Sequence, residues 1–213
     1  MGRLPFALRR ADLADADVVR GLARDAAKWL RGKNTDQWAT PWPDPQRKDE
    51  RLQEDLAAGR TWIVWDDDIG VGTVTINTQV PVDYEQNHVW PDNRRTETAL
   101  YVRRMIVRRS HAGLGLGAGL LDWATDVAKR ELSTTLLRID VWTTNHRLHD
   151  YYRHQGFTLC EFRDPAALPD YPARALFERR INPNGQSRAA LLFAGHQQSA
   201  LTWHQQSAHV DLG

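Results

Sequence analysis

The stretch that decides the fold runs from residue 101 to residue 121 and reads YVRRMIVRRSHAGLGLGAGLL. Residues 101–107 have the composition of a strand, and a short basic turn follows them. Glycine then occupies four alternate positions: Gly113, Gly115, Gly117 and Gly119. Apolar residues recur beyond the turn at the spacing of one helical face: Leu116, Leu120, Trp123, Ala124, Val127 and Leu132. A strand, a glycine-rich turn and an amphipathic helix in this order are typical of a main-chain anion site.

The glycine turn, residues 112–118, predicts a bound diphosphate. Glycine adopts positive φ angles and lets the backbone approach a ligand closely. A helix N-terminus adds unpaired N–H groups and the positive end of the helix dipole. The alternative is a turn that only packs a helix tightly against a sheet. The strand before the turn and the amphipathic helix after it favour the phosphate site.

The composition narrows the class of protein. A length of 213 residues suits one domain with or without appendages. The 28 basic and 27 acidic residues give a formal net charge of +1, which makes no electrostatic case for a nucleic-acid partner. The single cysteine, Cys160, excludes an internal disulfide and a cysteine-only zinc site. It also fits a reducing cytoplasm. With no apolar run long enough to span a bilayer, we expect a cytoplasmic protein without a membrane partner.

The chain divides into a main domain, residues 1–181, and a C-terminal appendage, residues 182–213. The segment NPNGQS marks the boundary, and the appendage contains the repeat HQQSA. We expect the appendage to be flexible or to act as a docking arm. Its histidines have intervals that suit no compact ligand set, so we expect no metal there: His196, His204 and His209. Residues 79–95 form a long polar connection of the kind that is often functional.

A second motif, NHRLHDYYRHQGF at residues 145–157, follows the next strand pattern. The two motifs together resemble those of the GNAT superfamily of acyl-CoA-dependent N-acyltransferases. The resemblance covers residues 6–181 and is most specific over residues 101–157. Two positions depart from the family pattern: Ala112 replaces an arginine or glutamine, and Leu148 replaces a small residue. Main-chain N–H groups hold most of such an anion, so Ala112 should weaken one contact without abolishing the site. The matching positions are Val107, Gly115, Gly117, Asn145, Tyr152, Gly156 and Phe157.

The resemblance implies an α+β GNAT fold, with a mixed central sheet of six to seven strands and helices on both faces. Strands 101–107 and 136–142 should splay apart, and the pantetheine arm of acetyl-CoA, the expected co-substrate, should lie in the gap. No metal is implied. The expected cofactor-binding residues are Met105, Ile106, Val107, Ala112, Gly113, Leu114, Gly115, Leu116, Gly117, Ala118, Asn145 and Tyr152.

The resemblance also implies direct attack by an amine in a ternary complex. The main-chain N–H of Val107 should polarise the thioester carbonyl. Tyr152 stands at the general-acid position, although packing of Tyr152, or Tyr151 as the acid, remains open. Asn145 should contact the pantetheine, cap the helix that it precedes, or do both. Glu97 is the expected base, although the base varies in this family and is often a water relay. Other candidates for the base are Tyr101, Asp83, Tyr84, Glu85, His88 and His111.

The family places the acceptor between the first two helices and the strands that follow them. Aromatic rings beside carboxylates suit a cationic amine of a small molecule or peptide. The expected substrate-binding residues are Trp38, Trp42, Tyr84 and Tyr101, and Trp29 and residues 79–95 should also line this region. The family often forms dimers, so a homodimer is a further expectation.

Two other functions compete with the transferase. A non-catalytic module that senses acyl-CoA remains open because Ala112 departs from the family pattern. A Rossmann-type dinucleotide enzyme is suggested by the spacing of Gly113, Gly115 and Ala118, with Asp140 downstream. Too few strands follow the glycine turn for that fold, and it leaves the motif of Asn145 and Tyr152 unexplained.

Overall fold

The computed structural model describes residues 6–33, 35, 37, 44–79, 89–91, 94, 96–164 and 172–195. An eight-stranded mixed sheet runs through them in the order β6-β7-β5-β4-β3-β2-β1-β8. The strands are β1 Phe6–Arg10, β2 Thr61–Asp66, β3 Ile69–Asn77, β4 Leu100–Val107, β5 Leu136–Trp142, β6 Thr158–Arg163, β7 Arg174–Arg180 and β8 Phe193–Ala194. The expected six to seven strands become eight because the short β8 joins the edge of the sheet beside β1.

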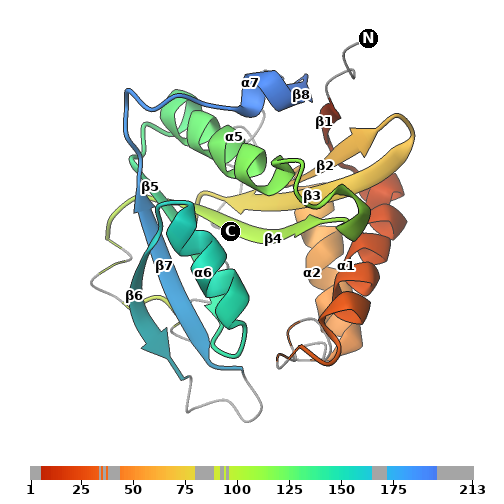
Figure 1. Ribbon diagram of the computed structural model, residues 1–213, viewed down its shortest axis with the longest axis horizontal. Coiled ribbons are helices and arrows are strands. Elements are labelled where there is room, and N and C mark those ends of the chain that lie inside the picture. Colours follow the sequence, from red (N-terminus) through yellow and green to blue (C-terminus); the bar gives the residue numbers. More distant parts are fainter. Residues whose placement is uncertain are drawn as a thin grey trace, which may run out of the picture.

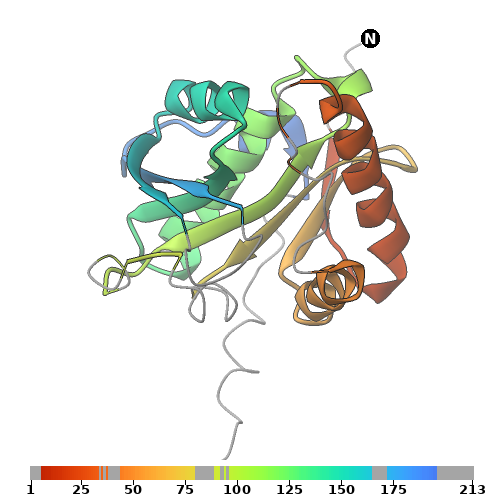
Figure 2. The same ribbon diagram turned by 90° about the horizontal axis from the view of Figure 1, so that it is seen from below.

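Helices cover both faces of the sheet, as expected for this fold class. Helices α1 and α2 lie on one face, and α5 and α6 lie on the other (Figures 1 and 2). The α-helices are α1 Ala16–Leu30, α2 Pro45–Ala57, α5 Leu116–Glu131, α6 His146–His154 and α7 Ala189–Leu192, with 3₁₀ turns η1 Leu13–Asp15 and η2 Arg109–His111. Within the described residues, no helix has the length and apolar character needed to cross a bilayer.

The pairing of β4 with β5 is short, and the gap beyond it determines where the candidate site lies. The two strands are parallel and paired at Leu100 with Leu137 and at Tyr101 with Arg138. No further pair joins them, although β4 continues to Val107 and β5 to Trp142. The strands therefore splay toward their C-terminal ends, as predicted. Strands β1 to β4 pair in antiparallel fashion, so this sheet is not the parallel sheet of a Rossmann domain.

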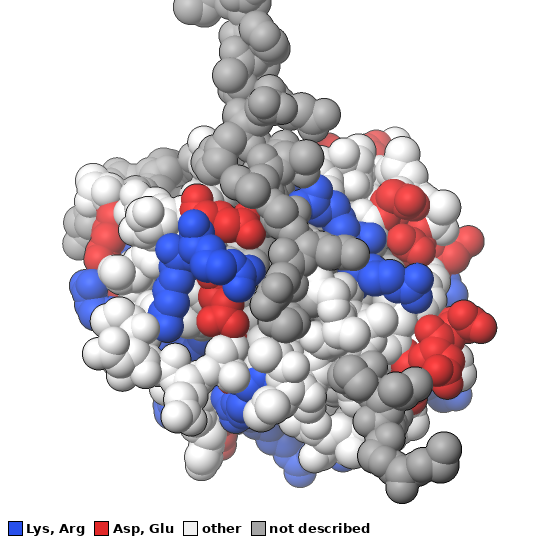
Figure 3. Space-filling model, turned by 90° about the horizontal axis from the view of Figure 1, so that it is seen from above, with Lys and Arg blue, Asp and Glu red and all other residues white. Residues whose placement is uncertain are grey.

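The main core lies between the sheet and α5. The apolar face of α5 predicted from its spacing is buried, and the Trp123 ring packs 4.9 Å from that of Trp62 on β2. A smaller cluster lies on the opposite face under α1 and α2, where Val19 and Leu56 meet Ile63. The outer surface carries both signs of charge side by side on the face shown in Figure 3, in line with the near-zero net charge.

The first part of the C-terminal appendage, residues 182–195, packs on its own domain. The Phe193 side chain is 1% exposed, and a Cβ atom at Gly119 on α5 would lie 3.0 Å from its ring. The main-chain N–H and the Nε of Arg188 both donate to the Asp122 carboxylate, at 3.1 and 2.6 Å. Ser187 Oγ lies 2.6 Å from Asp126. Residues 182–195 are thus part of the fold, and the HQQSA repeat lies outside the described residues.

This packing predicts that Phe193→Ala destabilises the whole domain. The substitution opens a cavity between β1, α5 and α7, and it should lower the free energy of unfolding by about 3 kcal/mol. Urea unfolding followed by circular dichroism measures the change. Leu191→Ala is the matched control because that side chain is 81% exposed, and it should leave stability nearly unchanged. Equal stability of the two variants would show that the segment does not contribute to the core.

Candidate cofactor and active site

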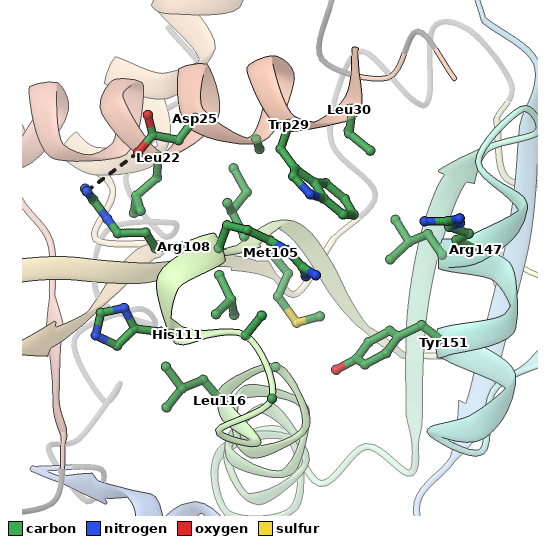
Figure 4. Close-up of a pocket in the computed structure, with 18 of the residues that line it drawn as sticks. Leu22, Asp25, Trp29, Leu30, Met105, Arg108, His111, Leu116, Arg147 and Tyr151 are labelled. Atoms are coloured by element: carbon green, nitrogen blue, oxygen red, sulfur yellow. Dashed lines mark ion pairs between the residues drawn. The ribbon is translucent and has the colours of Figure 1, made fainter. Parts of the chain in front are cut away.

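A cavity of about 580 Å³ lies between α1, the end of β4, the glycine turn and the start of α6. Figure 4 shows Trp29 and Leu30 on the α1 side, Met105 on β4, and Tyr151 projecting from α6 opposite them. The cavity collects residues from both sequence motifs, which are separated along the chain by the whole of α5 and β5. Ten of the twelve expected cofactor-binding residues line it: Met105, Ile106, Val107, Ala112, Gly113, Gly115, Leu116, Gly117, Ala118 and Asn145. Leu114 and Tyr152 do not.

The glycine turn presents the N-terminus of α5 to this cavity. Gly113 and Gly115 have φ angles of 84° and 78°, the left-handed region that glycine enters without strain. Gly115 is the N-cap, and no side chain caps the helix. The first N–H groups of a helix have no acceptor within the helix, so those of Leu116, Gly117 and Ala118 can bind an anion. Leu114 is 42% exposed and does not line the cavity.

Basic side chains surround the turn. The Arg109 guanidinium lies 4.6 Å from the centre of the Trp29 ring, and the Lys33 ammonium lies 5.0 Å from it. Arg108 lies 3.6 Å from Asp25. Trp29 is 36% exposed and lines the cavity, so it is not a core residue. These cations can offset the loss of the family's arginine or glutamine at the start of the turn.

His111 is less available as a base or an anion ligand than its position beside the glycine turn suggests. Both ring nitrogens are occupied: Nε2 lies 3.0 Å from an Asp66 carboxylate oxygen, and Nδ1 lies 2.9 Å from Ser110 Oγ. The ring also meets Phe6 edge to face. His111 therefore connects the glycine turn to the β2–β3 hairpin.

Asn145 begins α6 and adopts the capping role. Its Oδ1 accepts from the Leu148 N–H at 3.2 Å, and its Nδ2 donates to Gln37 Oε1 at 2.7 Å. The hydroxyls of Thr35 and Thr144 lie 3.1 Å apart beside this contact. The connection after α1 is thus held against the start of α6, at the open end of the β4–β5 gap.

The two neighbouring tyrosines of α6 have different surroundings. The Tyr151 hydroxyl is buried and has no hydrogen-bond partner among the described residues, and a Cβ at Gly117 would lie 2.6 Å from it. Burial raises the pKa of Tyr151 to about 12. The Tyr152 ring is in the core, 5.5 Å from that of Phe157. Burial raises the pKa of Tyr152 further, with added effects of Tyr151 and Asp140. Tyr151 therefore faces the glycine turn, whereas the Tyr152 ring packs near Phe157 and Phe177.

Tyr152 does not line the cavity, and its side chain is 2% exposed. Tyr152 thus contributes to the core through its ring, and its phenol remains protonated at neutral pH.

Two expected site residues lie away from the cavity. The Glu97 carboxylate pairs with Arg180 at 3.0 Å, before the start of β4. The Tyr101 side chain is 4% exposed, and its hydroxyl accepts from Arg138 at 2.9 Å. At about 3.3 Å per residue, Tyr101 is roughly 20 Å from Val107 along the strand. The positions of Glu97 and Tyr101 therefore support neither a base nor an acceptor contact at this cavity.

The other acceptor and base candidates fall outside the described residues: Trp38, Trp42, Asp83, Tyr84, Glu85 and His88. Within the described part of the chain, no group of three or more histidine, cysteine, aspartate and glutamate side chains could hold a metal ion.

The sequence analysis missed one feature of the site, a bulge in β4. Thr73 pairs with Ile106 and Thr75 with Arg103, so β4 contains one residue more than β3 over this interval. Arg104 has a φ angle of 45°, in the left-handed region. The pair of adjacent arginines inside an otherwise apolar strand is the only trace of the bulge in the sequence.

Comparison with known proteins agrees with this geometry. A family model described as "Acetyltransferase (GNAT) family" matches residues 24–157. An uncharacterized N-acetyltransferase, YesJ of Bacillus subtilis, is 27% identical over 143 residues, which cover 67% of this chain and 76% of YesJ. A GNAT acetyltransferase structure from Listeria monocytogenes has a TM-score of 0.62 at 20% identity, over 83% of this chain and 95% of that one. The PaiA N-acetyltransferase of Thermoplasma acidophilum, solved with coenzyme A, has a TM-score of 0.60 at 16% identity, over 84% and 100%.

The inner face of α6 predicts an acid-sensitive fold. His149 is 2% exposed, and its Nε2 donates to the Trp142 carbonyl at 3.0 Å. Burial lowers the pKa of His149 below its ordinary value of 6.5, despite the opposing effect of this hydrogen bond. Below pH 6.5 the unfolded chain takes up a proton that the folded ring resists, so the free energy of unfolding should fall as the pH drops. Above that pH this contribution is constant.

Urea unfolding between pH 5 and pH 8 measures this effect. His149→Gln keeps an N–H donor but cannot be protonated, so the variant should lose less stability than the parent on acidification. His154→Gln is the control because His154 is exposed. Parallel pH curves for the parent and His149→Gln would contradict the assignment.

Proposed function

The chain belongs to the acetyltransferase (GNAT) family, and on this basis we propose that it transfers an acetyl group from acetyl-CoA to a primary amine. The acceptor in this proposal is a small molecule or peptide that attacks the thioester directly. The observation that carries the proposal is the cavity, because it joins the uncapped N-terminus of α5 to the unpaired stretch of β4. An anion site and a gap beside an open strand are what a long, diphosphate-bearing thioester requires.

The residues that line the cavity fit the two ends of such a co-substrate. The N–H groups at the start of α5, with Arg109 and Lys33 nearby, suit the phosphates. Met105, Ile106 and Val107 offer apolar side chains and strand main chain to the pantetheine arm. We retain the Val107 N–H as the group that polarises the thioester carbonyl. CoA supplies the activated acyl group, and the protein supplies its position.

Two proton transfers accompany the reaction. Tyr152 stands at the family's general-acid position, and burial keeps its phenol protonated, so we assign to it the proton for the departing thiolate. The attacking amine must also lose a proton. Asp25 is the one carboxylate among the described residues that line the cavity, and it pairs with Arg108. We therefore assign this second transfer to water instead of Glu97.

A non-catalytic acyl-CoA sensor is the second candidate. It is favoured by Ala112 at the family's arginine or glutamine position and by the distance of Glu97 from the cavity. Release of free thiol from acetyl-CoA, measured with polyamines, aminoglycosides, amino acids and lysine peptides, separates the two functions. Release with at least one amine supports the transferase. Binding of acetyl-CoA by calorimetry without release from any amine class would favour the sensor.

The acid assignment predicts that Tyr152→Phe lowers kcat by about a hundredfold. The Kd for CoA should change by less than about threefold, because the lost hydroxyl acts on the leaving group. Tyr151→Phe is the comparison: its hydroxyl faces the glycine turn, so CoA binding should change more than kcat. Steady-state kinetics and calorimetry give both quantities. Loss of turnover in Tyr151→Phe but not in Tyr152→Phe would transfer the acid role to Tyr151.

The phosphate assignment predicts that Gly115→Val weakens CoA binding by at least tenfold. A Val at this position cannot keep the left-handed φ of 78° without strain, and its side chain would stand at the helix N-terminus. Gly195→Val is the control because Gly195 has the same positive φ, 78°, but lies after β8. Both variants should lose stability, whereas only Gly115→Val should lose CoA affinity in calorimetry. Equal CoA affinity in the two would remove the turn as the phosphate site.

A further inference from the structure

The bulge of β4 puts two successive arginines on one side of the sheet. In a regular strand, neighbouring side chains point to opposite faces. Here the guanidinium groups of Arg103 and Arg104 both reach the Asp55 carboxylate, at 3.6 and 3.0 Å. The extra residue of a bulge bends a strand and changes the direction of the residues after it. Immediately after this bulge come Met105, Ile106 and Val107, which line the cavity.

The conformation of Arg104 needs outside support. Its φ of 45° is one that residues with a Cβ atom adopt at a cost, and glycine does not stand at this position. The support is visible on the side chain: Arg104 donates to Asp55 at 3.0 Å and to the Thr75 hydroxyl at 3.1 Å. Thr75 belongs to the β3 stretch that pairs across the bulge. The guanidinium thus fixes the bulge to α2 on one side and to β3 on the other.

The arginines around Asp55 keep its buried carboxyl group ionised. Asp55 stands in the last turn of α2, its side chain is 3% exposed, and it also accepts from Arg60 Nε at 2.9 Å. Burial alone would raise the pKa of this carboxyl, but the charges of Arg103, Arg104 and Arg60 outweigh burial and lower it. An ionised carboxylate in such surroundings holds its partners strongly, because a buried charge without its counterion is costly.

We propose that Asp55 is a positioning residue for the reaction, acting through Arg104 to set the direction of the β4 main chain at the cavity. The role of Asp55 in the reaction rests on the proposed function. The structural part of the inference is that the Asp55 carboxylate, on α2 and on the sheet face opposite α5, fixes the backbone of residues 104–107. Met105, Ile106 and Val107 of that backbone line the cavity proposed to hold CoA.

The decisive comparison is made at position 104 itself. Arg104→Ala removes the clamp and keeps a Cβ, so the left-handed conformation loses its support. Arg104→Gly removes the same clamp but adopts the conformation freely. The Kd for CoA should therefore rise about tenfold in the Ala variant and stay within about threefold of the parent in the Gly variant. Equal weakening in both variants, or in neither, would overturn the inference.

Asp55→Asn extends the test to the carboxylate. It should weaken CoA binding as Arg104→Ala does, and adding Arg104→Gly should restore most of the affinity. Asp49→Asn is the matched control: Asp49 lies on the same helix and pairs with Arg20 at 2.7 Å, away from the bulge. It should leave the Kd for CoA unchanged. Retained CoA affinity in folded Asp55→Asn would contradict the inference while leaving the proposed function intact.

A second readout does not depend on CoA. Hydrogen exchange of the peptide that covers residues 103–107 should become faster in Asp55→Asn and Arg104→Ala, but not in Asp49→Asn or Arg104→Gly. Unchanged exchange in Asp55→Asn and Arg104→Ala would refute the clamp. If the parent protein itself fails to bind CoA, the proposed function falls, and the exchange measurement still decides the role of Asp55.

Discussion

The structure depends on a parallel strand pair that is allowed to form over only two residues. Leu100 and Tyr101 of β4 pair with Leu137 and Arg138 of β5, and the strands then separate. Main-chain N–H and C=O groups are rarely left without partners in a protein interior. In the gap between β4 and β5, main-chain N–H and C=O groups lack a partner strand. An extended ligand can form hydrogen bonds with these groups. The glycine turn and α6 stand at the open end of the same gap.

The chemistry of the site is encoded largely in the backbone. Gly115 leaves the N-terminus of α5 uncapped, and the bulge at Arg104 directs β4 toward the cavity. The side chains mostly hold this backbone in place: Asn145 caps α6 and contacts Gln37, and His111 connects the turn to Asp66. This division of roles explains how the fold can be shared with structures at 16 to 20% identity. The main-chain groups that we propose as the anion site do not depend on particular side chains.

The sequence predicts those parts of the site that depend on short-range patterns. Gly113 and Gly115 predict positive φ angles, and Asn145 predicts the start of a helix. The turn and α6 could therefore be placed from their spacing alone. The conformation of Arg104 could not, because its partner Asp55 lies 49 residues earlier and the contact exists only after folding. Glu97 was assigned to the site because it precedes the central strand. Only the family resemblance implied which end of that strand opens, because the register with β5 decides it.

The pairing of Phe6 with Phe193 has a consequence for how the chain reaches its final form. The two segments lie far apart in the sequence, so β1 is synthesised well before β8, and this edge of β1 stays uncovered until β8 follows. An uncovered strand edge is a template on which other chains can pair. The newborn protein therefore passes through an interval in which self-association competes with completion. A truncation that removes β8 would leave this edge of β1 uncovered permanently.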